Sequence, residues 1–141
     1  MVDLAELVQH AAVSLGALAA SHGAQLEIAR SERPCIAAVE PELADRLVAR
    51  LVTALAAHAA SNETLRLSLD RSGELCRVAI ARPAALRGVS DAALFGLQAP
   101  KTGDAAPGEA FALRLIRGLA RIAGGDLIAS PAGVALVFPI S

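Results

Sequence analysis

Apolar residues in the first part of the chain follow a helical spacing and then a strand-like one. Between Asp3 and Gly23 they recur every three or four positions, which predicts an amphipathic helix that begins after Asp3 and ends before the glycine. Residues 25–30 alternate polar and apolar side chains as a half-buried strand does, and residues 35–39 form a second short apolar run. The polar turn between these two segments predicts that they pair as a hairpin.

The middle of the chain repeats this order of elements. From Pro41 to Ala60 leucines fall four positions apart, which predicts a central and heavily buried helix with a proline in its first turn. Residues 64–69 and 75–80 each alternate polar and apolar side chains, and the turn between them contains Gly73. These two segments are predicted to form a second hairpin.

One long break in the pattern precedes the last elements. Residues 82–107 contain three prolines, three glycines and no sustained period, and loops of this length are usually functional or mobile. A third helix is predicted over residues 109–123, followed by a hairpin of residues 126–130 and 134–138. Three helices with about six strands predict a single α+β domain over residues 1–141, a two-layer sandwich with the helices on one face of a mixed sheet.

Composition narrows the classes of function. The 141 residues are 55% hydrophobic and 19% charged with a net charge of −1, which excludes a disordered chain and offers no attraction to nucleic acid or anionic membranes. No apolar run reaches the about 18 residues of a membrane span. Cys35 and Cys76 lack metal-like spacing and are expected to be buried thiols. We therefore expect a cytoplasmic domain with no membrane insertion.

The order of elements and several short motifs resemble the ATP-binding domain of sensor histidine kinases, the GHKL or Bergerat fold. The resemblance covers nearly the whole chain. Its matching segments are residues 2–8 (VDLAELV), residues 39–48 (VEPELADRLV), Leu94-Phe95 at the family's phenylalanine box, residues 108–125 at its glycine-rich box, and Phe138-Pro139. It implies a lid loop at about residues 82–107 and a role in bacterial two-component signalling.

The positions that hold Mg-ATP in this family carry unsuitable side chains here. The metal-binding asparagines of the central helix align with Arg50, which would repel the cation, and Ala54, which has no ligand atom. His58 stands where the family often has a residue that flanks the nucleotide. At the place of the adenine-reading aspartate the chain has Arg82 and no nearby carboxylate.

The glycine-rich box is also altered. Gly108 is kept, but Ala110 and Ala112 replace glycines that admit close approach of the backbone to phosphate. Each lost contact costs about 1–3 kcal/mol, whereas ordinary nucleotide affinity amounts to about −5.5 to −8 kcal/mol. The resemblance therefore implies a degenerate site with no catalytic residue, cofactor or metal. The family's phosphoacceptor motif is absent from the sequence as well.

Two functions remain open at this stage. The first is a non-catalytic protein-interaction module, part of a pseudokinase or phosphotransfer protein, whose partner is a response regulator or kinase. The alternative is an active kinase domain that binds ATP with Mg²⁺ through backbone contacts and His58.

Partner binding has its own candidate residues. They are Phe95, Leu97, Arg114, Arg117 and Arg121. The three arginines recur at helical spacing, and the ordinary interpretation is that they form a solvent-exposed face of the helix. Phe95 and Leu97 either cover the vacant cleft or are exposed contacts for another protein.

Overall fold

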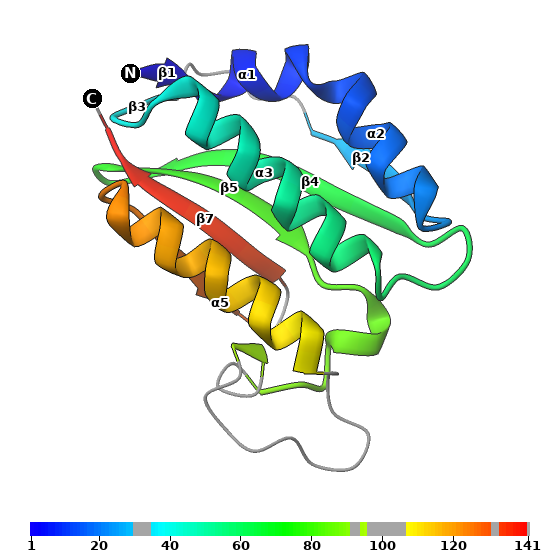
Figure 1. The fold of residues 1–141 in the computed structure, drawn as a ribbon. Helices are drawn as coiled ribbons and strands as arrows, with labels where there is room; N and C mark the ends of the chain where they lie inside the picture. The colour runs from blue at the N-terminus through cyan, green and yellow to red at the C-terminus, as the bar shows by residue number, and fades with distance from the viewer. Residues whose placement is uncertain (30–34, 91–93, 96–106, 131–132, 141) are drawn as a thin grey trace.

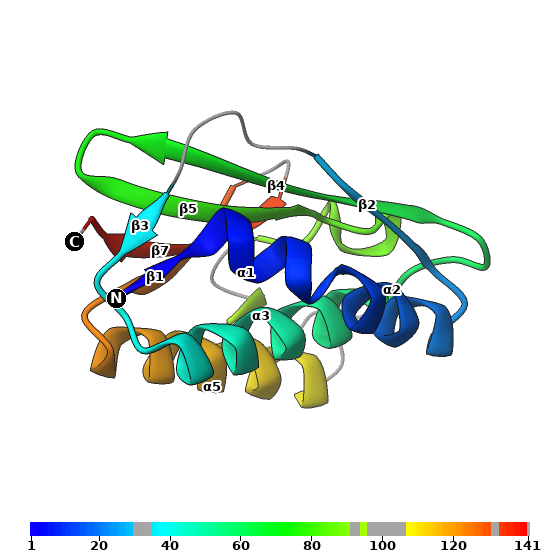
Figure 2. The ribbon, with the colours of Figure 1, turned by 90° about the horizontal axis from the view of Figure 1, so that it is seen from above.

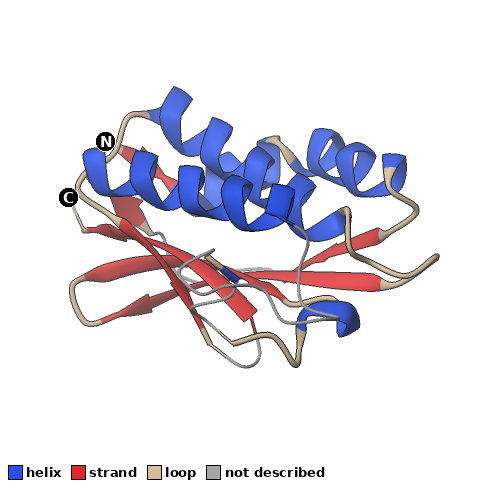
Figure 3. Ribbon diagram, turned by 60° about the horizontal axis from the view of Figure 1, so that its bottom comes forward, coloured by secondary structure: helices blue, strands red, loops and turns tan. Residues whose placement is uncertain are grey.

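The computed structural model describes residues 1–29, 35–90, 94–95, 107–130 and 133–140, with the side chains of 107–111 excepted. Helices lie on one face of a mixed sheet in two layers (Figures 1 and 3), which confirms the predicted fold class. The helices are α1 (Leu4–His10), α2 (Ala12–Ser21), α3 (Pro41–Ala56) and α5 (Pro107–Ile122), with a 3₁₀ turn, η1 (Ala84–Leu86). The strands are β1 (Val2–Asp3), β2 (Gln25–Ile28), β3 (Ile36–Ala37), β4 (Thr64–Ser72), β5 (Leu75–Ala81), β6 (Asp126–Ala129) and β7 (Gly133–Pro139).

The main sheet has five strands in the order β2-β4-β5-β7-β6. β2 and β4 are parallel, because α3 carries the chain back between them, and the other neighbours are antiparallel. Alternate side chains point toward the helices and form the core. They include Leu65, Leu67, Val78, Ile80 and Leu136, all at most 1% exposed.

The predicted pairing of residues 25–30 with 35–39 is wrong. β2 pairs along its length with β4, and β3 pairs with β1 through Val2 and Ala37. An isolated two-stranded hairpin is marginally stable, so β2 gains more from the edge of a large sheet. β1 has only two residues, too few for any periodicity to reveal it. The two later hairpins, β4–β5 and β6–β7, are confirmed.

The first predicted helix is two helices. α1 and α2 meet at Ala11 and are bent by 60° relative to each other. In the described residues no single helix is long and apolar enough to cross a membrane, although this bent pair together passes by length and composition.

α3 is the central helix of the helical layer. It lies between α2 and α5 on one face of the sheet, and Figure 2 shows this layer from a second direction. Leu47, Leu51 and Leu55 on its inner side are fully buried. The predicted central helix is thus confirmed, although it ends at Ala56, because His58 and Ala59 close the turn that leads into β4.

Candidate functional site

The positions that the resemblance assigns to the metal and the phosphates lie on α3 and α5. Arg50 and Ala54 of α3, with Ala112 of α5, line one groove of about 340 Å³. The remaining lining residues are Leu18, Ala49, Thr53, Leu115 and Ile116. Gly108 and Ala110 lie in the first turns of α5, and their side chains fall outside the described part of the structure. Two predicted positions of α3 and one of α5 therefore share one groove.

The described side chains of this groove are mainly apolar and do not suit a metal ion. Among the side chains that the structure describes here, the polar ones are Arg50, which is exposed, and Thr53. The Thr53 hydroxyl donates to the carbonyl of Ala49 at 2.9 Å and is thereby committed to the helix. Mg²⁺ prefers carboxylate, carbonyl and phosphate oxygens, and none of the described side chains that line the groove carries a carboxylate or amide. Among the described residues no cluster of His, Cys, Asp and Glu suits a metal ion.

Arg82 is a buried cation at the end of β5. Its side chain is 1% exposed, and Nη1 donates to the carbonyls of Val89 at 2.7 Å and Leu86 at 3.2 Å. A guanidinium can donate hydrogen bonds but cannot accept one. In sensor histidine kinases, which the sequence resembles, an aspartate at this position accepts a hydrogen bond from the adenine amine. Arg82 is instead a donor, and its guanidinium is already bound to backbone carbonyls of this chain.

Glu63, which precedes β4, binds the same segment, residues 82–89, through Ala84. Its two carboxylate oxygens accept from the backbone N–H of Ala84 at 2.9 Å and of Ala60 at 2.8 Å. These two hydrogen bonds lower the pKa of Glu63. Leu86 and Val89 are buried, so residues 82–89 are fastened to the core rather than free. Sequence reasoning missed Glu63, since nothing in the pattern links it to a segment 21 residues away.

The predicted partner-binding residues have different environments. Phe95 is 4% exposed, and the guanidinium carbon of Arg117 lies 4.8 Å from its ring centre. The Phe95 ring is therefore packed inside the domain, against Arg117 of α5. Arg114 is exposed. Leu97 and most of the predicted lid lie outside the described residues.

Asp126 at the start of β6 binds two of the predicted arginines. Its Oδ1 lies 3.0 Å from Nε of Arg121 and 3.3 Å from Nε of Arg117, and it also accepts from the backbone of Leu127 at 2.8 Å. Partial burial alone would raise the pKa of Asp126, but these hydrogen bonds lower it. Part of the basic stripe on α5 is therefore engaged within the domain.

His58 does not line the groove. It follows the end of α3 and is half-buried, and its pKa is lowered by burial and, second, by the nearby His22. The two histidines thus lie near each other where α2 and α3 end.

The two cysteines meet in the core. Cys35 and Cys76 are buried free thiols, as predicted. Burial and then a hydrogen bond with Cys76 raise the pKa of Cys35 to about 12. A thiol with such a pKa stays protonated at neutral pH and is a poor nucleophile.

Comparisons with solved structures identify the fold of the chain. No protein-family model and no curated protein sequence matches the chain. A solved mycobacterial sensor histidine kinase, MprB, superposes with a TM-score of 0.70 at 15% identity, over 98% of this chain and 96% of that one. The blue-light activated histidine kinase EL346 of Erythrobacter litoralis gives a TM-score of 0.60 at 19% identity, over 99% of this chain and 46% of that one. The chain therefore has the fold of a histidine-kinase-like domain.

Proposed function

We propose that residues 1–141 form a degenerate ATPase domain of the GHKL type, a pseudokinase module that binds proteins in two-component signalling and performs no phosphotransfer itself. The fold supports a kinase-related domain. The observation that supports the loss of nucleotide binding is the groove between α3 and α5, whose described lining is mainly apolar where a triphosphate and its metal would need oxygen ligands.

Arg82 supports the same proposal at the adenine end. Its guanidinium is bound to the carbonyls of Leu86 and Val89 and offers no acceptor to an adenine amine. Restoring a base pocket would require removing a buried charge as well as adding a carboxylate. The hydrogen-bonded Arg82 side chain is therefore unsuited to binding adenine.

The partner belongs to the same signalling class, a response regulator or a kinase. Arg50 of α3 lines the apolar groove and is exposed, and Leu115 on its α5 wall is 43% exposed. An acidic protein surface with an apolar centre would fit this face. We place the domain in the cytoplasm, where buried free thiols such as Cys35 and Cys76 are typical.

Titration with a fluorescent ATP analogue and Mg²⁺ tests the loss of nucleotide binding. We expect no saturable signal up to millimolar analogue, a Kd above about 1 mM. A double variant, Arg50→Asn with Ala54→Asn, restores amide oxygens to the groove and serves as the comparison. Saturable micromolar binding to the natural chain, competed by unlabelled ATP, would instead establish an active ATP-binding domain with an atypical site.

A further inference from the structure

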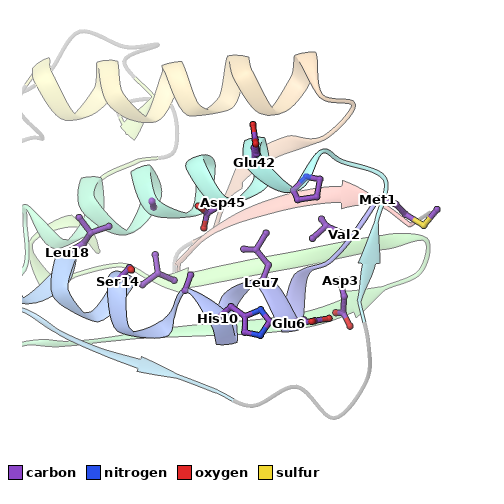
Figure 4. Close-up of a pocket in the computed structure, with 14 residues that line it drawn as sticks. Met1, Val2, Asp3, Glu6, Leu7, His10, Ser14, Leu18, Glu42 and Asp45 are labelled. Atoms are coloured by element: carbon purple, nitrogen blue, oxygen red, sulfur yellow. The ribbon is translucent and has the colours of Figure 1, made fainter.

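A second groove runs along the other side of α3, between that helix and the α1–α2 pair. Its volume is about 710 Å³, twice that of the α3–α5 groove. Figure 4 shows Leu7 of α1 and Val2 directed into it, with Asp45 on the facing side of α3. Apolar side chains, Leu15 and Leu18 among them, complete its floor.

The walls of this groove are acidic. Glu6 lies on α1, while Glu42 and Asp45 lie on α3, and all three are exposed. In the described part of the chain no arginine or lysine makes an ion pair with any of them. Glu6 and Glu42 lie in the first turns of their helices, where the helix dipole favours a negative charge, but no ion pair within the described residues neutralises the three carboxylates.

Two further ionisable side chains line the groove. Asp3 is committed to local structure, because its Oδ1 accepts from the backbone of Ala5 at 3.0 Å and of Cys35 at 3.3 Å. His10 is the one lining side chain that can become cationic. Neither changes the negative character of the walls at neutral pH.

We propose that this groove is a docking site for a basic amphipathic helix of a partner protein. An apolar stripe would fill the floor, and arginines or lysines on its flanks would meet the carboxylates of both walls. Acidic walls repel nucleic acid and anionic lipid, so these classes do not fit. A helix laid there would extend the helical layer of the domain.

The proposal deepens the role suggested above and rests on the domain being an interaction module. It does not depend on the loss of nucleotide binding, since the groove shares only Leu18 and Ala49 with the α3–α5 groove. The ATP-analogue titration and the peptide experiment below can therefore fail separately.

The experiment measures fluorescence anisotropy of a labelled synthetic helix of about 18 residues, one apolar leucine stripe with arginines on its flanks. We expect saturable binding that weakens as salt rises. A double variant, Glu42→Gln with Asp45→Arg, should weaken binding by about tenfold or more. Glu42 is only neutralised because a cation in the first turn of α3 would oppose the helix dipole.

Matched controls separate docking from general attraction. Glu27→Arg with Glu74→Gln changes the net charge by the same amount on exposed positions that do not line the groove, and it should leave affinity unchanged. A peptide with glutamates in place of the arginines should not bind. Circular dichroism confirms that each variant is folded.

Three results would overturn the proposal. Equal binding of the glutamate peptide would indicate apolar adhesion alone. Equal loss of affinity in the control and groove variants would place the contact elsewhere. Self-association of the natural chain in analytical ultracentrifugation, abolished by the groove variant, would make a second copy of the chain the occupant; its α5 exposes Leu115 and Ile122 beside Arg114.

Discussion

At the scale of single residues, two charged side chains hold the segment that follows β5. Arg82 is buried and donates to the carbonyls of Leu86 and Val89, and Glu63 accepts from the backbone of Ala84. A buried charge such as that of Arg82 is tolerated only when it is hydrogen-bonded, so the guanidinium and the two carbonyls fix each other's positions. The segment thereby occupies a fixed path beside the sheet.

Substitution of Arg82 tests this anchor. Arg82→Ala removes the donor of the Val89 carbonyl and one of the two donors of the Leu86 carbonyl, and it opens a cavity. We expect a loss of about 2–4 kcal/mol in the free energy of unfolding. Arg82→Lys should recover part of that loss because it keeps a cation with fewer donors. Urea unfolding measures both. A loss below about 0.5 kcal/mol for the alanine variant would show that the anchor contributes little.

Glu63 predicts a pH dependence. Its pKa is lowered in the folded state from the ordinary value of 4.5, so its contribution to stability is present above that value and is lost as the pH falls through the lower folded pKa. We expect the stability difference between the natural chain and Glu63→Gln to be largest near neutral pH and to shrink in acid. Urea midpoints measured across the acid range check this. A difference that grows in acid would contradict the sign.

At the scale of elements, the connection from α5 to β6 is sterically tight. A Cβ added at Gly125 would collide with the backbone carbonyl of Val137 and lie 2.7 Å from Cδ1 of Phe138. Gly124 before it has a φ of +88°, a conformation that glycine adopts freely. These two glycines let α5 end and β6 start close beneath it, which also brings Asp126 to the arginines of α5.

A pair of glycine variants tests this packing. Gly125→Ala is expected to lower the free energy of unfolding by about 1–3 kcal/mol, because a backbone atom must move. Gly118→Ala, in the middle of α5 with nothing within 4 Å of its added Cβ, is the control and should stabilise by about 0.5–1 kcal/mol. Thermal or urea unfolding compares the two. Similar effects from both substitutions would refute the steric account.

At the scale of the whole molecule, charge is distributed unevenly over the helical layer. α3 has an acidic groove on the α1–α2 side and, on the α5 side, an apolar groove that is lined by the exposed Arg50. The net charge of −1 conceals this asymmetry. Repulsion between like charges that persists in the free protein is typical of a surface adapted to a partner of opposite charge.

Neutralising one acidic side chain should therefore stabilise the free protein. We expect Asp45→Asn to raise the free energy of unfolding by about 0.3–0.5 kcal/mol at low ionic strength and to have no effect at about 1 M salt. Glu74→Gln, at an exposed turn outside the groove, is the matched control with no such gain. Urea unfolding of both variants at the two salt concentrations measures this difference. A loss of stability in Asp45→Asn at low salt would contradict repulsion between the carboxylates of the groove.

Long periodic elements could be predicted from the residues alone. α3, α5 and the strands β4 and β5 follow from leucine spacing and clean alternation, because each buries one face wherever it packs. The fold class followed from their order. The chemistry of Arg50 and Ala54 could be judged in advance as well, since the absence of a ligand atom does not depend on tertiary structure.

Contacts between distant segments needed the three-dimensional arrangement. β2 is too short for its own pattern to select between β3 and β4 as partner, and the sheet edge made that choice. The contacts of Glu63 with Ala84, of Cys35 with Cys76 and of Asp126 with Arg117 depend on which surfaces the core brings together. Local periodicity records only which face of an element is buried, whereas packing determines what lies against that face.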